Sequence, residues 1–287
     1  MNLQSFEDEY RALLAKHSKS PEEAVEVSRK LCPTKRAVLI GINYTGQRGE
    51  LSGCHNDVDN MVKYLSTCGF TKFTVLKDSE YVLNSLQPTH ANILYQLERN
   101  ISRTRAGDTL YVHYSGHGSY TRDLSGDEID GRDETICPID YAKSGDITDD
   151  VLRELFLRAD IRAKIRVCFD ACHSGSALDL PVRWVSHRRQ VVENISGGSI
   201  ENKHDIVFIS GCMDSQTSAD AWIDRKATGA MTYALLKTLW EMKKAGPFTW
   251  CEIITLMRVY LKGERYEQIP QLSAEYLDIV YTNCDLI

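Results

Sequence analysis

The sequence predicts an α/β protein, a three-layer α/β/α sandwich with a central, mostly parallel sheet. Apolar runs of strand length recur along the chain, as expected for strands that are buried on both faces. Segments with apolar residues at helical spacing separate these runs. Small and polar residues directly follow several of the runs, where open α/β sheets place their ligands. A chain of 287 residues, 43% of them hydrophobic, can bury one large core.

The first part of the chain predicts helices that precede the sheet. Residues 1–33 form a leader in which Phe6, Tyr10 and Leu13 share one helical face, and Ser20 with the following Pro marks a second helix start. The leader is too short for a domain. A single α/β domain is therefore expected over residues 34–287.

The order of elements within that domain follows from the hydrophobic pattern. Strands are expected at 35–42, 73–76, 108–114, 164–170, 205–210 and 276–281. Helical patterns lie between them, at 54–65, 90–99, up to about 157, 229–243 and 249–261. The stretch 123–146 is predicted to be an acidic loop, and the basic, Gly- and Ser-containing stretch at about 181–203 a long mobile loop.

Composition excludes several classes of protein. The net charge of −6 argues against binding to nucleic acid or to an anionic membrane surface by bulk charge. No apolar run is long enough to cross a bilayer, and the N-terminus lacks a signal-peptide pattern, so we expect a soluble, cytoplasmic protein. The nine cysteines include no C-x-x-C pair, so most are expected to be small buried residues, Cys168 most clearly.

The run from Arg166 to Gly175 predicts a nucleophile. A buried strand ends at Asp170 and is followed by Ala171 and Cys172, which brings a thiol to the edge of the sheet. A thiol becomes a strong nucleophile only when a nearby base takes its proton. His173 would point to the opposite side of an extended chain, so the base must come from another segment.

His117 is the candidate for that base. It stands between two glycines just beyond the strand at 108–114, a setting that exposes an imidazole and gives its backbone freedom. A lone histidine there would more often be structural. Parallel neighbouring strands, however, bring their carboxyl ends to the same edge, so Cys172 and His117 together satisfy the requirement for a thiolate and a base.

These residues resemble a known family. The runs His113 to Gly118 and Asp170 to Gly175 are similar to motifs of the metacaspases, the caspase-like clan of cysteine peptidases, in particular to a type I catalytic core. Further matching segments lie in the same order, at 54–58, 126–134, 147–150 and 210–220. The resemblance covers roughly Arg36 to the C-terminus, and several matches in order are specific where one would be weak.

The resemblance implies a caspase-like fold and an endopeptidase that forms a thioester acyl-enzyme, with Cys172 as nucleophile and His117 as acid and base. It also implies a monomer that acts on protein or peptide substrates. The leader could cover the active-site groove in a resting zymogen. An alternative is a catalytically weak or inactive scaffold or regulatory protein, since some relatives lose the Cys or the His; both are intact here.

An acidic pocket is expected beside the thiol. Asp57 and Asp170 fall at sheet-edge positions, and a buried carboxylate pair is unfavourable unless a cation joins it. Arg or Lys before the cleaved bond would supply that cation. The resemblance implies that the walls of the pocket are formed by Cys54, Asp57, Ser115 and Asp170. A role as helix N-cap is about as plausible for Asp57.

Aspartates near the predicted catalytic edge suggest Ca²⁺, which prefers oxygen ligands. They are too many for solubility alone, and their spacing is not that of an EF-hand. The resemblance implies a calcium site at Asp133, Asp149, Asp150 and Asp179. Asp149 or Asp150 could instead cap the helix that follows.

The basic loop after the nucleophile is a possible autocleavage site. An enzyme that cuts after Arg or Lys could process its own chain at Arg183, Arg188 or Arg189. An ordinary exposed linker is an equal alternative.

Overall fold

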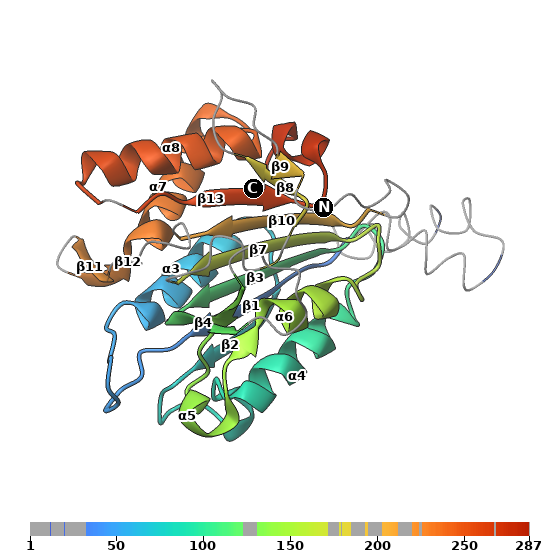
Figure 1. The fold of residues 1–287 in the computed structure, drawn as a ribbon. Coiled ribbons are helices and arrows are strands. Elements are labelled where there is room, and N and C mark those ends of the chain that lie inside the picture. The colour runs from blue at the N-terminus through green and yellow to red at the C-terminus, as the bar shows by residue number, and fades with distance from the viewer. Residues whose placement is uncertain are drawn as a thin grey trace.

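A central sheet dominates the computed structural model, which describes residues 12, 20, 33–122, 131–171, 178, 180–184, 193–194, 203–211, 220–223, 226–266 and 268–286. Within this part the sheet has eight strands in the order β2-β1-β3-β7-β10-β13-β8-β9 (Figure 1). Their bounds are β1 Lys35–Gly41, β2 Lys72–Lys77, β3 Thr109–Ser115, β7 Lys164–Asp170, β8 Val182–Trp184, β9 Glu193–Asn194, β10 Asp205–Ser210 and β13 Gln271–Ala274. The first five strands in this order are parallel and the last three pair antiparallel, so the predicted mostly parallel sheet is confirmed.

Helices cover both faces of the sheet and complete three layers. One face carries α3 (Cys54–Ser66), α7 (Ala230–Ala245) and α8 (Trp250–Gly263), and the other carries α4 (His90–Ile101) and α6 (Asp149–Phe156). Side chains alternate along β3 accordingly: Tyr111 packs in the first core and Val112 in the second. The sequence predicted each of these helices because its apolar stripe faces the sheet.

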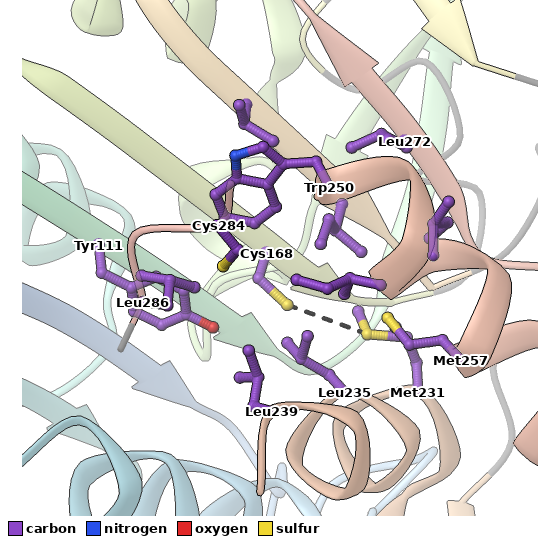
Figure 2. Packing of buried hydrophobic residues seen from close by; sticks show 14 of the residues in the cluster. Tyr111, Cys168, Met231, Leu235, Leu239, Trp250, Met257, Leu272, Cys284 and Leu286 are labelled. Carbon is purple, nitrogen blue, oxygen red and sulfur yellow. Dashed lines mark hydrogen bonds between the residues drawn. The ribbon is translucent and has the colours of Figure 1, made fainter. Parts of the chain in front are cut away.

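The core under α7 and α8 contains sulfur and aromatic side chains. Figure 2 shows Cys168 of β7 facing Met231 of α7, with Trp250 of α8 nearby; the two sulfur atoms are 3.9 Å apart. The cysteines at 54, 68, 137, 168, 251 and 284 are buried and free, as the composition predicted. Burial raises the pKa of the Cys168 thiol, so this cysteine stays protonated and unreactive.

Other segments depart from the sequence prediction. The expected acidic loop contains β5 (Arg132–Ile136) and α5 (Tyr141–Ser144), and β5 joins β4 (Gly118–Arg122) and β6 (Ile147–Thr148) in a small sheet. The expected mobile loop contains β8 and β9, which extend the main sheet. The minor elements that remain are η1 Asn84–Leu86 and the hairpin of β11 Asp220–Ile223 with β12 Lys226–Gly229.

The prediction of a strand at 276–281 is wrong. Residues Leu277–Tyr281 form a 3-10 helix, η2, and the strand that pairs antiparallel with β10 is β13, a few residues earlier. Ile279 and Val280 are residue types that are common in strands. Both are buried in the core beside α8, and this packing, not β propensity, determines their conformation.

The predicted leader lies outside the described residues except at positions 12, 20 and 33. None of the helices in the described part combines the length and hydropathy that a bilayer span requires.

Candidate active site

The carboxyl ends of three neighbouring strands are level with one another. The register pairs Gly41 of β1 with Ser115 of β3, and Ser115 with Asp170 of β7. His117 follows β3 by two residues, and Cys172 follows β7 by two residues. Cys172 itself lies outside the described residues. The structure therefore establishes that β3 and β7 are adjacent and parallel up to this edge, as the sequence predicted.

The imidazole of His117 is half-buried and held by a backbone carbonyl. Its Nε2 lies 2.5 Å from the carbonyl oxygen of Gly49, in the loop between β1 and α3. Because a carbonyl oxygen only accepts, Nε2 must carry a proton, which leaves Nδ1 as the acceptor in the neutral ring. A role for His117 as a base would therefore use Nδ1.

Gly116, before His117, was expected to give the backbone conformational freedom, but the structure shows a steric reason for glycine at this position. Gly116 is not in the left-handed region of backbone conformation. A Cβ at this position would lie 2.6 Å from the hydroxyl oxygen of Tyr114. Glycine is required here by close packing.

The two aspartates of the predicted pocket are buried close to each other, beside Gly229. Asp57, on α3, is 0% exposed and Asp170, at the end of β7, is 4% exposed. Ser115 Oγ donates to Asp57 Oδ2 at 2.7 Å, so three of the four predicted pocket residues lie together. Cys54, the fourth, is buried one turn before Asp57 on the same helix. The N-cap of α3 is Gly53, so Asp57 does not cap its helix.

The N-terminal end of α7 supplies donors to both carboxylates. The Gly229 N–H donates to both oxygens of Asp57, at 2.9 and 3.0 Å, and Thr228 Oγ1 donates to Asp57 Oδ1 at 2.5 Å. Thr232 donates to Asp170 Oδ2 from its backbone N–H and from its hydroxyl, both at 2.8 Å. The positive end of the α7 dipole therefore faces the acid pair.

These donors were not predicted from the sequence. Thr228, Gly229 and Thr232 stand at the start of a helix that the apolar stripe had located. Helix N-termini are general anion-binding sites, and that signal could have connected them with the two aspartates.

Burial and mutual repulsion shape the charge of the pocket. Burial, and after it the charge of Asp170, raise the pKa of Asp57 to about 7. Near neutral pH the pair consequently favours a bound proton or a bound cation. The groups that donate to Asp57, from Ser115, Thr228 and Gly229, are all neutral, so none of these three offsets a negative charge on the pair.

The predicted calcium residues are only partly described. Asp133 on β5 and Asp149, the first residue of α6, are buried at 8% and 2% exposure, and Asp150 follows Asp149. Thr148 is the N-cap of α6 and accepts from the Val151 N–H, so neither aspartate is the N-cap; Asp149 Oδ1 accepts from the Asp150 N–H at 3.0 Å. Asp179 lies outside the described residues.

Carboxylate oxygens suit Ca²⁺, but a complete site is not formed by the described residues alone. No three His, Cys, Asp or Glu side chains converge there closely enough to hold a metal ion. Full coordination would have to include other groups.

Of the three possible autocleavage residues, the structure describes Arg183, which lies in a strand that was not predicted. Arg183 lies in the middle of β8, paired with Ser273 of β13 on one side and with Glu193 of β9 on the other. Arg188 and Arg189 lie outside the described residues.

Comparison with known proteins agrees with this geometry. Residues 35–181 match the family model "Metacaspase, peptidase C14 domain". The chain is 34% identical over 290 aligned positions to Metacaspase-1 of Meyerozyma guilliermondii, covering 84% of this chain and 70% of that protein. It is 35% identical over 301 positions to Metacaspase-1 of Ajellomyces capsulatus, covering 87% and 83%.

Solved structures support the fold. A Geobacter sulfurreducens protein aligns with a TM-score of 0.60 at 22% identity, over 87% of this chain and 97% of that one. Caspase-1 of Spodoptera frugiperda aligns with a TM-score of 0.55 at 14% identity, over 85% and 89%. The fold is thus caspase-like, and because the family model matches residues 35–181 and both relatives align over most of the chain, the chain belongs to the metacaspases, a family of caspase-like cysteine peptidases.

Proposed function

We propose that this protein is a calcium-dependent cysteine endopeptidase that cleaves peptide bonds after Arg or Lys. The observation that carries the proposal is the buried pair Asp57 and Asp170, located at the same sheet edge as His117. The family supports a cysteine peptidase, and the acid pair supports the choice of substrate.

The reaction proceeds through a thioester. The Cys172 thiol transfers its proton to His117 Nδ1, and the thiolate attacks the carbonyl carbon of the substrate. As the C–N bond breaks, His117 returns the proton to the leaving amine. A water molecule then attacks the thioester, giving its proton to His117, and the thiol is restored when the acid product leaves.

The preference for Arg or Lys follows from electrostatics. A guanidinium or ammonium group entering the pocket replaces the proton that the acid pair would otherwise hold, and its charge is attracted by both carboxylates. An acidic side chain would add a third negative charge in a buried place. We therefore expect negligible cleavage after Asp.

Calcium is expected to be held by Asp133, Asp149, Asp150 and Asp179, and to be needed at roughly millimolar concentration, the weak end of the range for protein sites. Its contribution is structural: neutralising the aspartates near β5 and α6. Asp133 and Asp149 support this proposal because both carboxylates are buried.

One experiment tests nucleophile, specificity and metal together. A peptide library is incubated with wild type, Cys172→Ala and Asp170→Asn, each in calcium and in chelator. We expect cleavage after Arg and Lys by wild type in calcium only, none by Cys172→Ala, and loss of the basic preference in Asp170→Asn. Equal cleavage of Arg peptides by Asp170→Asn would overturn the assigned pocket, and equal activity in chelator would overturn the role of calcium.

A further inference from the structure

Tyr44 contacts His117 from the loop between β1 and α3 and is 0% exposed. We propose that Tyr44 is a positioning residue that holds the imidazole of His117 in the orientation needed for proton transfer. The inference rests on the proposed role of His117 as acid and base.

The hydroxyl group of Tyr44 fixes the backbone of His117. The His117 N–H donates to the Tyr44 hydroxyl oxygen at 3.0 Å, and the Tyr44 hydroxyl donates to the carbonyl oxygen of Cys137 at 2.6 Å. Beside it, the Tyr114 hydroxyl donates to the His117 carbonyl oxygen at 2.7 Å. Two tyrosine hydroxyls, 3.0 Å apart, thus hold both backbone groups of His117.

The ring of Tyr44 lies against the imidazole itself. The ring centroids of Tyr44 and His117 are 4.6 Å apart, with an interplanar angle of 34°. The same loop supplies the Gly49 carbonyl that accepts from Nε2. One loop therefore limits both the tilt of the ring and its rotation about χ2.

The backbone of Tyr44 is in an unfavourable conformation that its surroundings enforce. Its φ is +52°, in the left-handed region, where residues with a Cβ are uncommon. Asp78, just after β2, accepts from the N–H groups on both sides of Tyr44, from Asn43 at 2.8 Å and from Thr45 at 3.3 Å. His55 Nε2 lies 2.7 Å from the same carboxylate. Backbone strain of this kind is typical of functional sites, and Tyr44 contacts His117, the proposed acid and base.

Removing the Tyr44 hydroxyl should affect the chemical step and not substrate binding. Burial raises the pKa of Tyr44 well above its ordinary value, so the hydroxyl remains protonated throughout the working range. Asp57 accepts its hydrogen bonds from Ser115, Thr228 and Gly229, so the pocket does not depend on Tyr44.

The test compares Tyr44→Phe with Tyr111→Phe in the full chain. Tyr111 is an equally buried tyrosine on β3 whose hydroxyl lies 3.3 Å from His113 Nδ1, in the other core. We expect Tyr44→Phe to lower kcat for an Arg peptide about tenfold, with KM within about twofold, because one hydrogen bond to a positioned group is lost. Tyr111→Phe should keep kcat within about twofold.

A second readout does not require peptidase activity. In ¹⁵N spectra of the histidine side chains, wild type should show His117 protonated at Nε2, and Tyr44→Phe should show a mixture of tautomers. If wild type lacks Cys172-dependent cleavage, the proposed function fails, yet these spectra still decide the role of Tyr44. Unchanged kcat together with an unchanged His117 signal in Tyr44→Phe would overturn the inference.

Asp78→Asn tests the positioning role of Tyr44 if Tyr44→Phe does not fold. This variant weakens the anchor on both sides of Tyr44 without touching His117, and its control is Asp59→Asn, which removes an exposed carboxylate that pairs with Lys77. A fall of kcat in Asp78→Asn with KM retained, absent in Asp59→Asn, supports the inference; equal kcat in the two variants contradicts it.

Discussion

Asp57 of α3 and Asp170 of β7 meet at one glycine, Gly229, the N-cap of α7. A Cβ on Gly229 would lie 2.1 Å from Asp170 Oδ2 and 2.9 Å from Asp57 Oδ2. The two carboxylates therefore sit on either side of a position that has no room for a side chain. Because Gly229 has no side chain, both buried carboxylates fit at the start of α7, where they accept hydrogen bonds from its N–H groups.

Gly229→Ala should close the pocket. The added methyl group forces both carboxylates to move, and we expect KM for Arg peptides to rise at least about tenfold and the free energy of unfolding to fall by about 1–3 kcal/mol. Steady-state kinetics and urea unfolding measure the two effects. Gly263→Ala is the matched control, because a Cβ at that helical glycine meets no atom within 4 Å; a Gly229→Ala enzyme with normal KM would refute the steric argument.

Cation binding to the pocket should release a proton. The pKa of Asp57 is raised to about 7 by burial and by Asp170, so folding takes up a proton here, and this group lowers stability as pH rises from about 4 to about 7. A bound cation favours the ionised form of Asp57 over the protonated form. For Cys172→Ala, affinity for ethylguanidinium should therefore increase from pH 6 towards pH 8, by at most about tenfold per pH unit below the pKa.

Calorimetry in buffers of different ionisation enthalpy measures the released proton directly. A heat of binding that does not vary with the buffer, or an affinity independent of pH, would show that the acid pair is already ionised. Asp57→Asn should abolish the dependence.

The buried ion pairs of the Arg166 guanidinium should be costly to break. Arg166 is 3% exposed on β7 and makes two hydrogen bonds of 2.9 Å to Asp285 near the C-terminus. Asp285→Ala leaves the buried charge with Asp205 as its remaining carboxylate partner, so we expect a loss of about 3 kcal/mol in the free energy of unfolding. Glu154→Gln, which removes an exposed i,i+4 partner of Arg158, should cost less than about 1 kcal/mol. Similar losses in both variants would contradict this difference.

Calcium binding and helix capping can be separated at the start of α6. Asp149→Asn should raise the calcium concentration needed for activity, because a buried carboxylate ligand is lost. Thr148→Ala removes the N-cap and should lower stability by about 1 kcal/mol without changing that concentration. Calcium titrations of activity and of thermal unfolding test both variants, and the ligand assignment fails if the two show the same calcium requirement as wild type.

Autocleavage, if it follows the proposed specificity, should occur after Arg188 or Arg189 and not after Arg183. A protease binds an extended segment with free backbone groups, whereas Arg183 is hydrogen-bonded in β8 between two strands. Mass spectrometry of incubated wild type should show fragments ending at 188 or 189, and Cys172→Ala should remain intact. A fragment ending at Arg183 would mean that β8 leaves the sheet before cleavage.

The sequence by itself determined the five parallel strands of the sheet, the helices that cover it and the edge at which His117 and Asp170 lie. Strands buried on both faces carry continuous apolar runs, and the end of each run marks where β3 and β7 deliver their polar residues. Short strands such as β8 and β9 escaped prediction because their stability comes from pairing with β13 and with each other, which no local pattern records.

Only the tertiary structure decided how the site is assembled. Gly229 lies 59 residues beyond Asp170 and 172 beyond Asp57, and Gly49 lies 68 before His117. Such contacts depend on which helix end and which loop the sheet places beside a side chain, so sequence spacing cannot reveal them. His117, Asp170 and Cys172 were visible as sequence motifs, whereas Gly229, which lies beside both carboxylates, and Tyr44, which contacts the imidazole of His117, became visible only through packing.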